Sequence, residues 1–235
     1  MLFSVILCFS IVSSTKTCFA QEAGVIFVRA DGSIDPPTAP ISTVGNVTYN
    51  LTADLGTEAV VIYRNNIIFD GNSHSLQGLK LANCDNVTIT NATVAVDPYG
   101  FTGIAGIWVT NSSNINIHTN NATGCPTVVI DIQSSSCVSI HENNITNNLE
   151  AIKLEGTAKS SIYRNFIYVN RSHLATGYGI IISGLSNDNS IFENDIIGMD
   201  HGIEIFDSGE NHIYHNNFID NQEDPYVYNS TMQNF

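Results

Sequence analysis

Arg164 stands out among the few residues of this 235-residue sequence that could act on a charged sugar. Glu142 precedes it by 22 residues, and Glu193 follows it by 29 residues. An arginine can neutralise a uronate while a neighbouring carboxylate takes the C5 proton, which is the chemistry of a polysaccharide lyase. If the fold places these residues side by side, they form either such an acid–base pair or an exposed ladder of charges.

Two histidines show a similar spacing. His118 and His141 are 23 residues apart, and imidazole nitrogens bind copper and other borderline metals. Two ligands without a third make an incomplete site, so the alternative is a stacked pair of rings that holds no metal. Calcium is the other cation compatible with the sequence, because acidic residues continue to Asp224 while no lysine or arginine follows Arg171.

A third set of residues has the chemistry of sugar recognition. Trp108 is the only tryptophan of the chain. The equivalent place in neighbouring segments is held by Lys80, Asp131 and Lys153. An indole ring offers a large flat face with a polar N–H at its edge, which suits a sugar ring. The set predicts a glycan-binding face, with ordinary cross-strand packing of the tryptophan as the alternative.

These residues recur at fixed offsets because the sequence repeats itself. With the isoleucine of "VSIHENN" as an anchor, the underlying period is about 22 residues, and the anchors are Phe69, Ile89, Ile117, Ile140, Ile162, Ile191 and Ile213. Apolar residues stand ten and eight positions before almost every anchor, with a variable residue between them. This alternation predicts a short strand with one buried face in each repeat. Ser183, eight positions before its anchor, predicts a local weak point in the core.

Asparagine stands three positions after five of the anchors, at Asn120, Asn143, Asn165, Asn194 and Asn216. Because asparagine tolerates the left-handed backbone region, each is expected at a sharp corner. Stacked corners let side-chain amides hydrogen-bond along the column. Three short strands per repeat predict an all-β parallel β-helix of about seven coils. A leucine-rich repeat is disfavoured, because the apolar residues are mostly Ile or Val and the asparagine follows the second apolar strand.

The repeated phrase "GIEIFDSGENHIYHNNFIDN" resembles the NosD-like right-handed parallel β-helix proteins. These belong to a wider group of carbohydrate-binding and sugar-hydrolase β-helices. The opening "VIFVRADGSIDPPTAPISTVGNVTYNL" resembles the start of secreted archaeal members. The resemblance covers roughly residues 25–221. It implies a right-handed parallel β-helix solenoid, and it implies polysaccharide or copper as ligands that such proteins handle.

The segment "DPYG", which begins at Asp97, resembles the Asp-Pro-His motif of mannuronan C5-epimerases, but Tyr99 stands where the histidine would be. Asp97 and Arg164 are therefore the candidates for catalysis. Three functions remain open. The first choice is a non-catalytic scaffold that binds glycans and requires no cofactor. The alternatives are a lyase, hydrolase or C5-epimerase acting on acidic glycans, and a copper-associated accessory protein of the NosD type.

The start of the chain predicts export. Residues 1–20 contain an apolar run, Leu2–Val12, followed by a small-residue cleavage site at Ala20, which is typical of a signal peptide. We expect residues 21–57 to cap the solenoid, residues 58–221 to form it, and residues 222–235 to be a tail that stops short of the closing segment common in the family. No later stretch is long enough to span a membrane. A secreted, extracellular or cell-surface location is expected.

Composition limits the partners. The formal net charge of −14 disfavours nucleic acid, so a polysaccharide or cell-surface glycan is the partner we expect, while the oligomeric state is not set by the sequence. Cys84, Cys125 and Cys137 show neither disulfide nor zinc spacing. Nine Asn-x-Ser/Thr sequons are candidate N-glycosylation sites, at Asn46, Asn50, Asn86, Asn91, Asn111, Asn121, Asn144, Asn170 and Asn229.

Overall fold

The structure is a computed structural model that describes residues 24–95, 105–125, 127–170, 177–230 and 233. The expected leader and Asp97 lie outside these residues. The described part of the chain consists of strands, turns and bends without a helix, which confirms the all-β class. It accordingly contains no helix of the length and apolarity that a membrane span requires.

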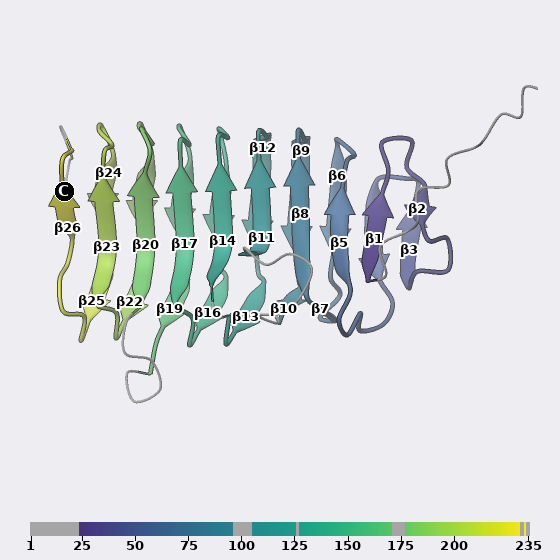
Figure 1. The fold of residues 1–235 in the computed structure, drawn as a ribbon, viewed down its shortest axis with the longest axis horizontal. Helices are drawn as coiled ribbons and strands as arrows, with labels where there is room; N and C mark the ends of the chain where they lie inside the picture. The colour runs from purple at the N-terminus through teal and green to yellow at the C-terminus, as the bar shows by residue number, and fades with distance from the viewer. Residues whose placement is uncertain (1–23, 96–104, 126, 171–176, 231–232, 234–235) are drawn as a thin grey trace, which may run out of the picture.

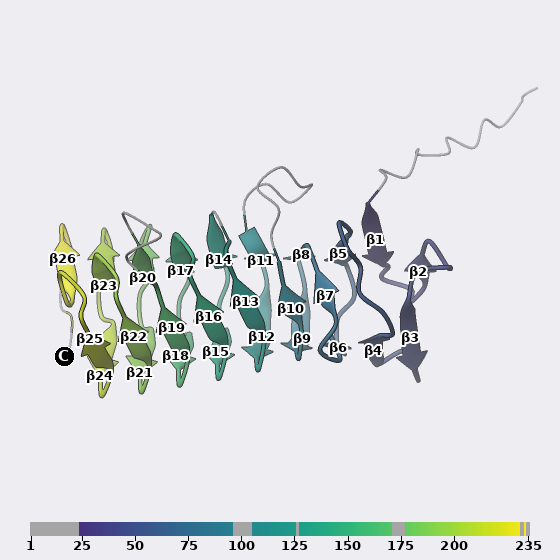
Figure 2. The ribbon, with the colours of Figure 1, turned by 90° about the horizontal axis from the view of Figure 1, so that it is seen from below.

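The strands form three sheets that run the length of the molecule, here named sheets A, B and C (Figures 1 and 2). Sheet A contains, in spatial order, β2 (Ile34–Asp35), β1 (Val25–Val28), β5 (Ala59–Ile62), β8 (Gly78–Ala82), β11 (Ala105–Thr110), β14 (Val128–Gln133), β17 (Glu150–Glu155), β20 (Tyr178–Ser183), β23 (His201–Phe206) and β26 (Tyr226–Tyr228). Sheet B contains β3 (Ile41–Val44), β4 (Thr48–Leu51), β6 (Ile67–Asp70), β9 (Asp85–Thr90), β12 (Ser113–His118), β15 (Ser139–His141), β18 (Ser161–Tyr163), β21 (Ser190–Phe192) and β24 (His212–Tyr214). Sheet C contains β7 (Ser75–Leu76), β10 (Thr93–Val94), β13 (Asn121–Thr123), β16 (Asn144–Thr146), β19 (Phe166–Tyr168), β22 (Asp195–Ile197) and β25 (Asn217–Ile219).

The chain visits sheets A, B and C in turn and then returns to A beside the strand it left. Strand β11 of sheet A, for example, pairs in parallel with β8 of the preceding coil and β14 of the next. Antiparallel pairing among the described residues occurs between β1 and β2 and between β3 and β4, near the N-terminal end (Figure 1). This topology confirms the predicted parallel β-helix. Strands β1 and β26 extend sheet A on either side of the coils that the anchors mark.

The core is a set of stacked apolar columns. The anchor residues pair in register along sheet B, where Ile140 stacks on Ile162 and Ile162 on Ile191. All three are fully buried. Each such side chain contributes about 1.5–3 kcal/mol by burial, before the entropy of ordering the chain is subtracted. Because no coil can bury its apolar face alone, the stability is shared between neighbours.

The expectation of a weak point at Ser183 is wrong, because the register of β20 differs by one residue from the count. Ile180 pairs with Ile203 and Ile182 pairs with Ile205, so these two isoleucines fill the inward columns. Ser183 instead pairs with Glu155 of β17. Three residues separate Ile182, the last inward residue of β20, from Ser186. In the following coil, two residues separate Ile205 from Ser208. Consequently Ile181, and not Ile182, holds the outward position of β20.

The asparagine column forms a hydrogen-bonded ladder inside the solenoid. The Asn143 side-chain nitrogen donates to the Asn165 side-chain oxygen at 2.9 Å, and Asn165 donates in the same way to Asn194 at 2.9 Å. The left-handed corner, however, lies one residue earlier than predicted. Glu142 and Arg164 have φ of 55° and 54°, whereas the asparagines that follow are absent from the left-handed region. The preceding residue turns the chain, and the asparagine side chain then fills the corner from within.

Two further columns join neighbouring coils. In the column five positions before the anchors, the backbone N–H of Ser186 donates to the side-chain oxygen of Ser208 at 3.2 Å. Asn189 and Asn211, each two positions before its anchor, pair through their side chains at 3.0 Å. Only two asparagines occupy that column, so it lacks the repetition that revealed the other ladder.

Candidate functional site

The residues expected to bind sugar form one row on the outer face of sheet A. Trp108 of β11 is in register with Lys80 of β8 and with Asp131 of β14, and Asp131 is in register with Lys153 of β17. The Lys80 ammonium lies 4.0 Å from the centre of the indole ring, a cation–π contact. One face of Trp108 is therefore covered by a flexible lysine, which a sugar ring would have to displace in order to stack there.

The centre of this row contains two buried polar atoms, Trp108 Nε1 and Asp131 Oδ1, that have no hydrogen-bond partner among the described residues. The other carboxylate oxygen of Asp131 accepts a hydrogen bond from Gln133 Nε2 at 2.9 Å. Asp131 is only 2% exposed. Burial raises the pKa of this carboxyl, and nearby Lys153 only partly opposes the rise. An unpaired N–H donor and an unpaired carboxylate acceptor thus lie on adjacent strands.

We expect Asp131→Asn to stabilise the fold at neutral pH. Because the folded-state pKa of Asp131 lies above its ordinary value, ionising this carboxyl destabilises the folded protein as the pH rises through that pKa. The neutral amide removes this cost. The expected gain in Tm is about 2–4 °C, corresponding to about 1 kcal/mol for a chain of this size. Calorimetric scans of both proteins should show that gain at pH 7 and none in acid below the ordinary carboxyl pKa. An equal gain at both pH values would contradict the prediction.

The same face is hollowed further along the sheet. A groove of about 300 Å³ is lined by Glu150, Lys153, Tyr178, Ile181, Glu204, Phe206 and Tyr228. Ile181 lies between Lys153 and Glu204 in the central column. Tyr178 is in register with Glu150 on one side, and Tyr228 is in register with Phe206 on the other. The groove has no signature in the sequence, because the columns that flank it change residue type from coil to coil.

The charged side chains of the groove differ in whether they have an oppositely charged partner. The Lys153 ammonium contacts the Glu155 carboxylate at 2.8 Å, and Glu204 lies 3.6 Å from a ring nitrogen of His201. The Glu150 carboxylate makes no hydrogen bond or short ion pair with the residues that the structure describes. Burial raises its pKa, and Glu204 adds to the rise, whereas Lys153 opposes it. The groove therefore presents a carboxylate, that of Glu150, that remains available to a ligand.

Arg164 does not lie near this groove. It stands at a corner that follows β18 of sheet B, where its side chain is 59% exposed and contacts Glu193 of the next coil at 2.7 Å. The contact is an exposed ion pair between neighbouring corners, which is worth little to stability. Because the arginine is already paired, the geometry favours the charge ladder over an acid–base pair. The other candidate for catalysis, Asp97, lies outside the described residues.

His118 and His141 begin a continuous stack of rings on sheet B. Their ring centres are 4.9 Å apart, with planes inclined by 9°. The stack continues through Tyr163, Phe192 and Tyr214, at ring separations of 4.7–5.1 Å. Stacks of this kind stabilise neighbouring strands by about 0.5–1.5 kcal/mol per pair beyond the burial of their area. The described geometry is that of a stacked ladder.

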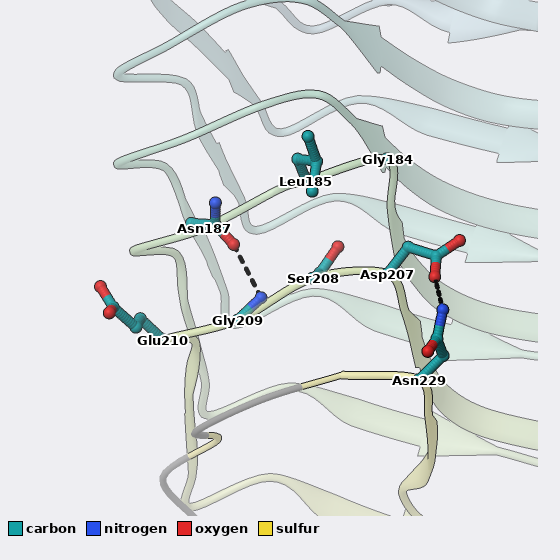
Figure 3. Close-up of a pocket in the computed structure, with 8 residues that line it drawn as sticks. All are labelled: Gly184, Leu185, Asn187, Asp207, Ser208, Gly209, Glu210 and Asn229. Carbon is teal, nitrogen blue, oxygen red and sulfur yellow. Dashed lines mark hydrogen bonds between the residues drawn. The ribbon is translucent and has the colours of Figure 1, made fainter.

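A larger hollow, of about 660 Å³, lies at the turns between sheets A and B in the last coils (Figure 3). Its polar groups serve the turns themselves. The Asn187 side-chain oxygen accepts the Gly209 N–H at 2.7 Å, and Asn229 bonds to Asp207, while Glu210 points away (Figure 3). None of the described residues that line it is aromatic. The smaller groove on sheet A has the more distinctive chemistry.

A comparison with the models of known protein families identifies the family of this chain. The model of the family described as "Periplasmic copper-binding protein (NosD)" matches residues 38–199 and 170–235. The chain belongs to the NosD family. No curated protein sequence matches it.

Among solved structures, the NosD-family chain is similar to a hyperthermoactive exopolygalacturonase from Thermotoga maritima, with 12% identity and a TM-score of 0.48. The match covers 89% of this chain and 62% of the enzyme. An alginate lyase from Paenibacillus sp. str. FPU-7 shows 9% identity and a TM-score of 0.36, and the match covers 76% of this chain and 93% of the lyase. The periplasmic alginate epimerase AlgG shows 15% identity and a TM-score of 0.35, and the match covers 75% of this chain and 59% of the epimerase.

The family description raises the question of copper in this NosD chain. Copper(II) binds nitrogen and oxygen ligands that converge on one point. His118 and His141 stack face to face, and ring nitrogens at their edges contact Thr119 at 2.9 Å and Asn116 at 3.0 Å. Within the described ranges, no three His, Cys, Asp or Glu side chains gather as a metal site would require. Among the described residues, the two stacked histidines lack a third ligand and therefore do not fit a copper centre.

The sequon asparagines of the NosD chain lie mostly at corners and on outer columns. Five have positive φ, namely Asn46, Asn86, Asn91, Asn111 and Asn229. Asn144 donates to Asn121 of the neighbouring coil at 3.0 Å, so these two form an outer pair. Asn50 lies in β4, and Asn170 follows β19. Part of the high number of sequons is explained by asparagines that form corners or pair between coils. Glycosylation at these sites stays a prediction.

Proposed function

We propose that this NosD-family chain is an exported β-helix scaffold that binds glycans along the outer face of sheet A without cleaving them. The observation that carries the proposal is the groove lined by Tyr178, Phe206 and Tyr228 together with Glu150, Glu204 and Lys153. Aromatic faces supply apolar contact for sugar rings, and the charged groups supply hydrogen bonds to hydroxyls.

The row that leads to this groove offers a second recognition element. Trp108 Nε1 is a buried donor and Asp131 Oδ1 a buried acceptor, and neither has a partner in the part of the chain that the structure describes. A sugar hydroxyl is both an acceptor and a donor, and because the two atoms are buried, it reaches either of them only when the covering side chains move aside. Leaving buried polar atoms unpaired costs about 1–3 kcal/mol each. A ligand that pairs them would recover that free energy.

The non-catalytic reading is supported by the position of the charged residues. Arg164 is paired with Glu193 at a corner of sheet B, away from the groove on sheet A. Export is supported by the apolar run within residues 1–20 and by the family description, which names a periplasmic protein.

Titration calorimetry with neutral and charged oligosaccharides tests the proposal, and mass spectrometry of the same mixtures tests for products. We expect binding without a change in the oligosaccharides. Tyr228→Ala, which removes one aromatic wall of the groove, should lower affinity at least about tenfold, the loss of roughly 1.4 kcal/mol. Phe166→Ala is the matched control, because Phe166 is an aromatic of similar exposure (40% against 43%) on sheet C.

Thermal melting should show that both variants remain folded. Failure of every oligosaccharide to bind, or an equal loss of affinity in Phe166→Ala, would overturn the glycan-binding proposal. Shortened, unsaturated or epimerised products would overturn the non-catalytic reading and favour an enzyme.

A further inference from the structure

We propose that the groove on sheet A selects amino sugars, holding the protonated amine of a glucosamine-type residue between its carboxylates and its aromatic rings. The inference rests on the proposed function and names its ligand class. Three features carry it, namely the two carboxylates, of which Glu150 is unpaired among the described residues, the aromatic walls, and a lining whose one basic residue, Lys153, is already paired.

The carboxylates come from two strands that flank β20. Glu150 on β17 has no hydrogen-bond partner in the described part of the chain, and Glu204 on β23 lies 3.6 Å from His201. Strands β17 and β23 are two strand spacings apart, about 10 Å. An ammonium group on a sugar ring lying across β20 can therefore reach either carboxylate. A half-buried, unpaired carboxylate gains more from a charged donor than from a hydroxyl.

Aromatic rings stand on both sides of the same space. Tyr178 lies beside Glu150 on one side, and Phe206 and Tyr228 form the other. Cations are attracted to the faces of aromatic rings, and the attraction grows when water is excluded. Burial raises the pKa of Tyr178, and the nearby carboxylates of Glu204 and Glu150 raise it further, so both carboxylates act on the space beside this ring.

The groove lacks what a uronate would need. Uronate carboxylates are usually held by arginine or by a free lysine, because these groups donate charge-assisted hydrogen bonds. Lys153 is the only basic residue among the lining residues, and it is paired with Glu155 at 2.8 Å. An acidic sugar would face Glu150 and Glu204 without a free counter-charge. Neutral sugars would gain the aromatic contact but no charged interaction.

Calorimetric titration with matched oligosaccharides tests this selection. The probes are a glucosamine tetramer, its fully N-acetylated counterpart and a galacturonate tetramer, used with the full protein at about pH 6, where the amines carry protons. We expect the glucosamine tetramer to bind at least about tenfold more tightly than the acetylated one, roughly 1.4 kcal/mol. The galacturonate tetramer should bind most weakly.

Glu150→Gln and Glu204→Gln keep shape while removing charge. Each should weaken binding of the glucosamine tetramer about tenfold and change the acetylated tetramer less than about twofold, because only the first loses a charged partner. Glu142→Gln removes the same charge from an exposed corner of sheet B and should change neither affinity. It controls for general attraction to an acidic chain.

Equal binding of the two tetramers, unaffected by the glutamate variants, would overturn the inference and leave the glycan-binding proposal standing. Preference for the galacturonate tetramer would also overturn it. If none of the three binds and no other oligosaccharide does, the proposed function itself fails, and the inference fails with it.

Discussion

Asn165→Ala is expected to lower the free energy of unfolding by about 3–5 kcal/mol, enough to abolish folding in a marginally stable chain. The Asn165 side-chain nitrogen donates to Asn194 Oδ1 and to the backbone oxygen of Ile140, each at 2.9 Å. Its oxygen accepts from the backbone N–H and the side chain of Asn143, at 3.1 and 2.9 Å. Alanine would leave these buried groups of two neighbouring coils unpaired, and each costs about 1–3 kcal/mol.

Urea denaturation of this variant should be compared with that of Asn144→Ala. Asn144 follows the ladder residue Asn143, and its amide bonds at an exposed position to Asn121. Because water can replace that bond, we expect Asn144→Ala to cost about 0.5 kcal/mol or less. A loss of similar size in both variants would show that the buried ladder has no special role in stability. Because the coils share their stability, a large loss at Asn165 should lower the whole transition.

The fold could be predicted from the sequence because stacking forces the inward columns to repeat. A residue such as Ile140 must match its neighbours above and below in size and polarity, so the constraint is visible in one sequence. The same constraint explains why Asn143 and Asn165 were recognisable as a ladder. The position of the left-handed corner was not recognisable, because Glu142 and Arg164 adopt positive φ without being residue types that favour it.

Counting back from an anchor fails where a turn changes length. The turn after β20 holds one more residue than the turn of the following coil, so the count placed Ser183 in a column that Ile182 fills. A single sequence gives no independent marker of that change, because isoleucines occupy three successive positions, 180–182. The register was settled by the pairing of β20 with β17 and β23.

The groove could not be predicted, because outward columns are free of the stacking constraint. Glu150, Tyr178 and His201 occupy equivalent positions in successive coils but share neither size nor charge. Only the alignment of three coils shows that an unpaired carboxylate and several aromatic rings enclose one space. For Lys80, Trp108 and Asp131 the sequence did predict a common row, since all three are polar or aromatic at one outward position.

Gly198→Asn is expected to destabilise the protein by about 3 kcal/mol, in contrast to the same change at Gly124. Both glycines stand seven positions after an anchor and have positive φ, 77° and 70°. Asparagine is accepted in this column, because Asn147 adopts a φ of 55° there. Backbone conformation alone would therefore allow the substitution at either glycine.

The two positions differ in the space around them. A Cβ atom at Gly198 would overlap the backbone oxygen of Val169, whereas one at Gly124 would meet no atom of the described residues within 4 Å. A backbone oxygen cannot rotate away from this overlap. Strand β22 would therefore have to separate from β19, which would loosen the packing of sheet C. Gly124→Asn should change the stability by about 0.5 kcal/mol or less. Urea denaturation of the two variants gives both values. Equal stability of the two variants would mean that the coils adjust freely at this corner, and close stacking at Gly198 would then not limit the sequence.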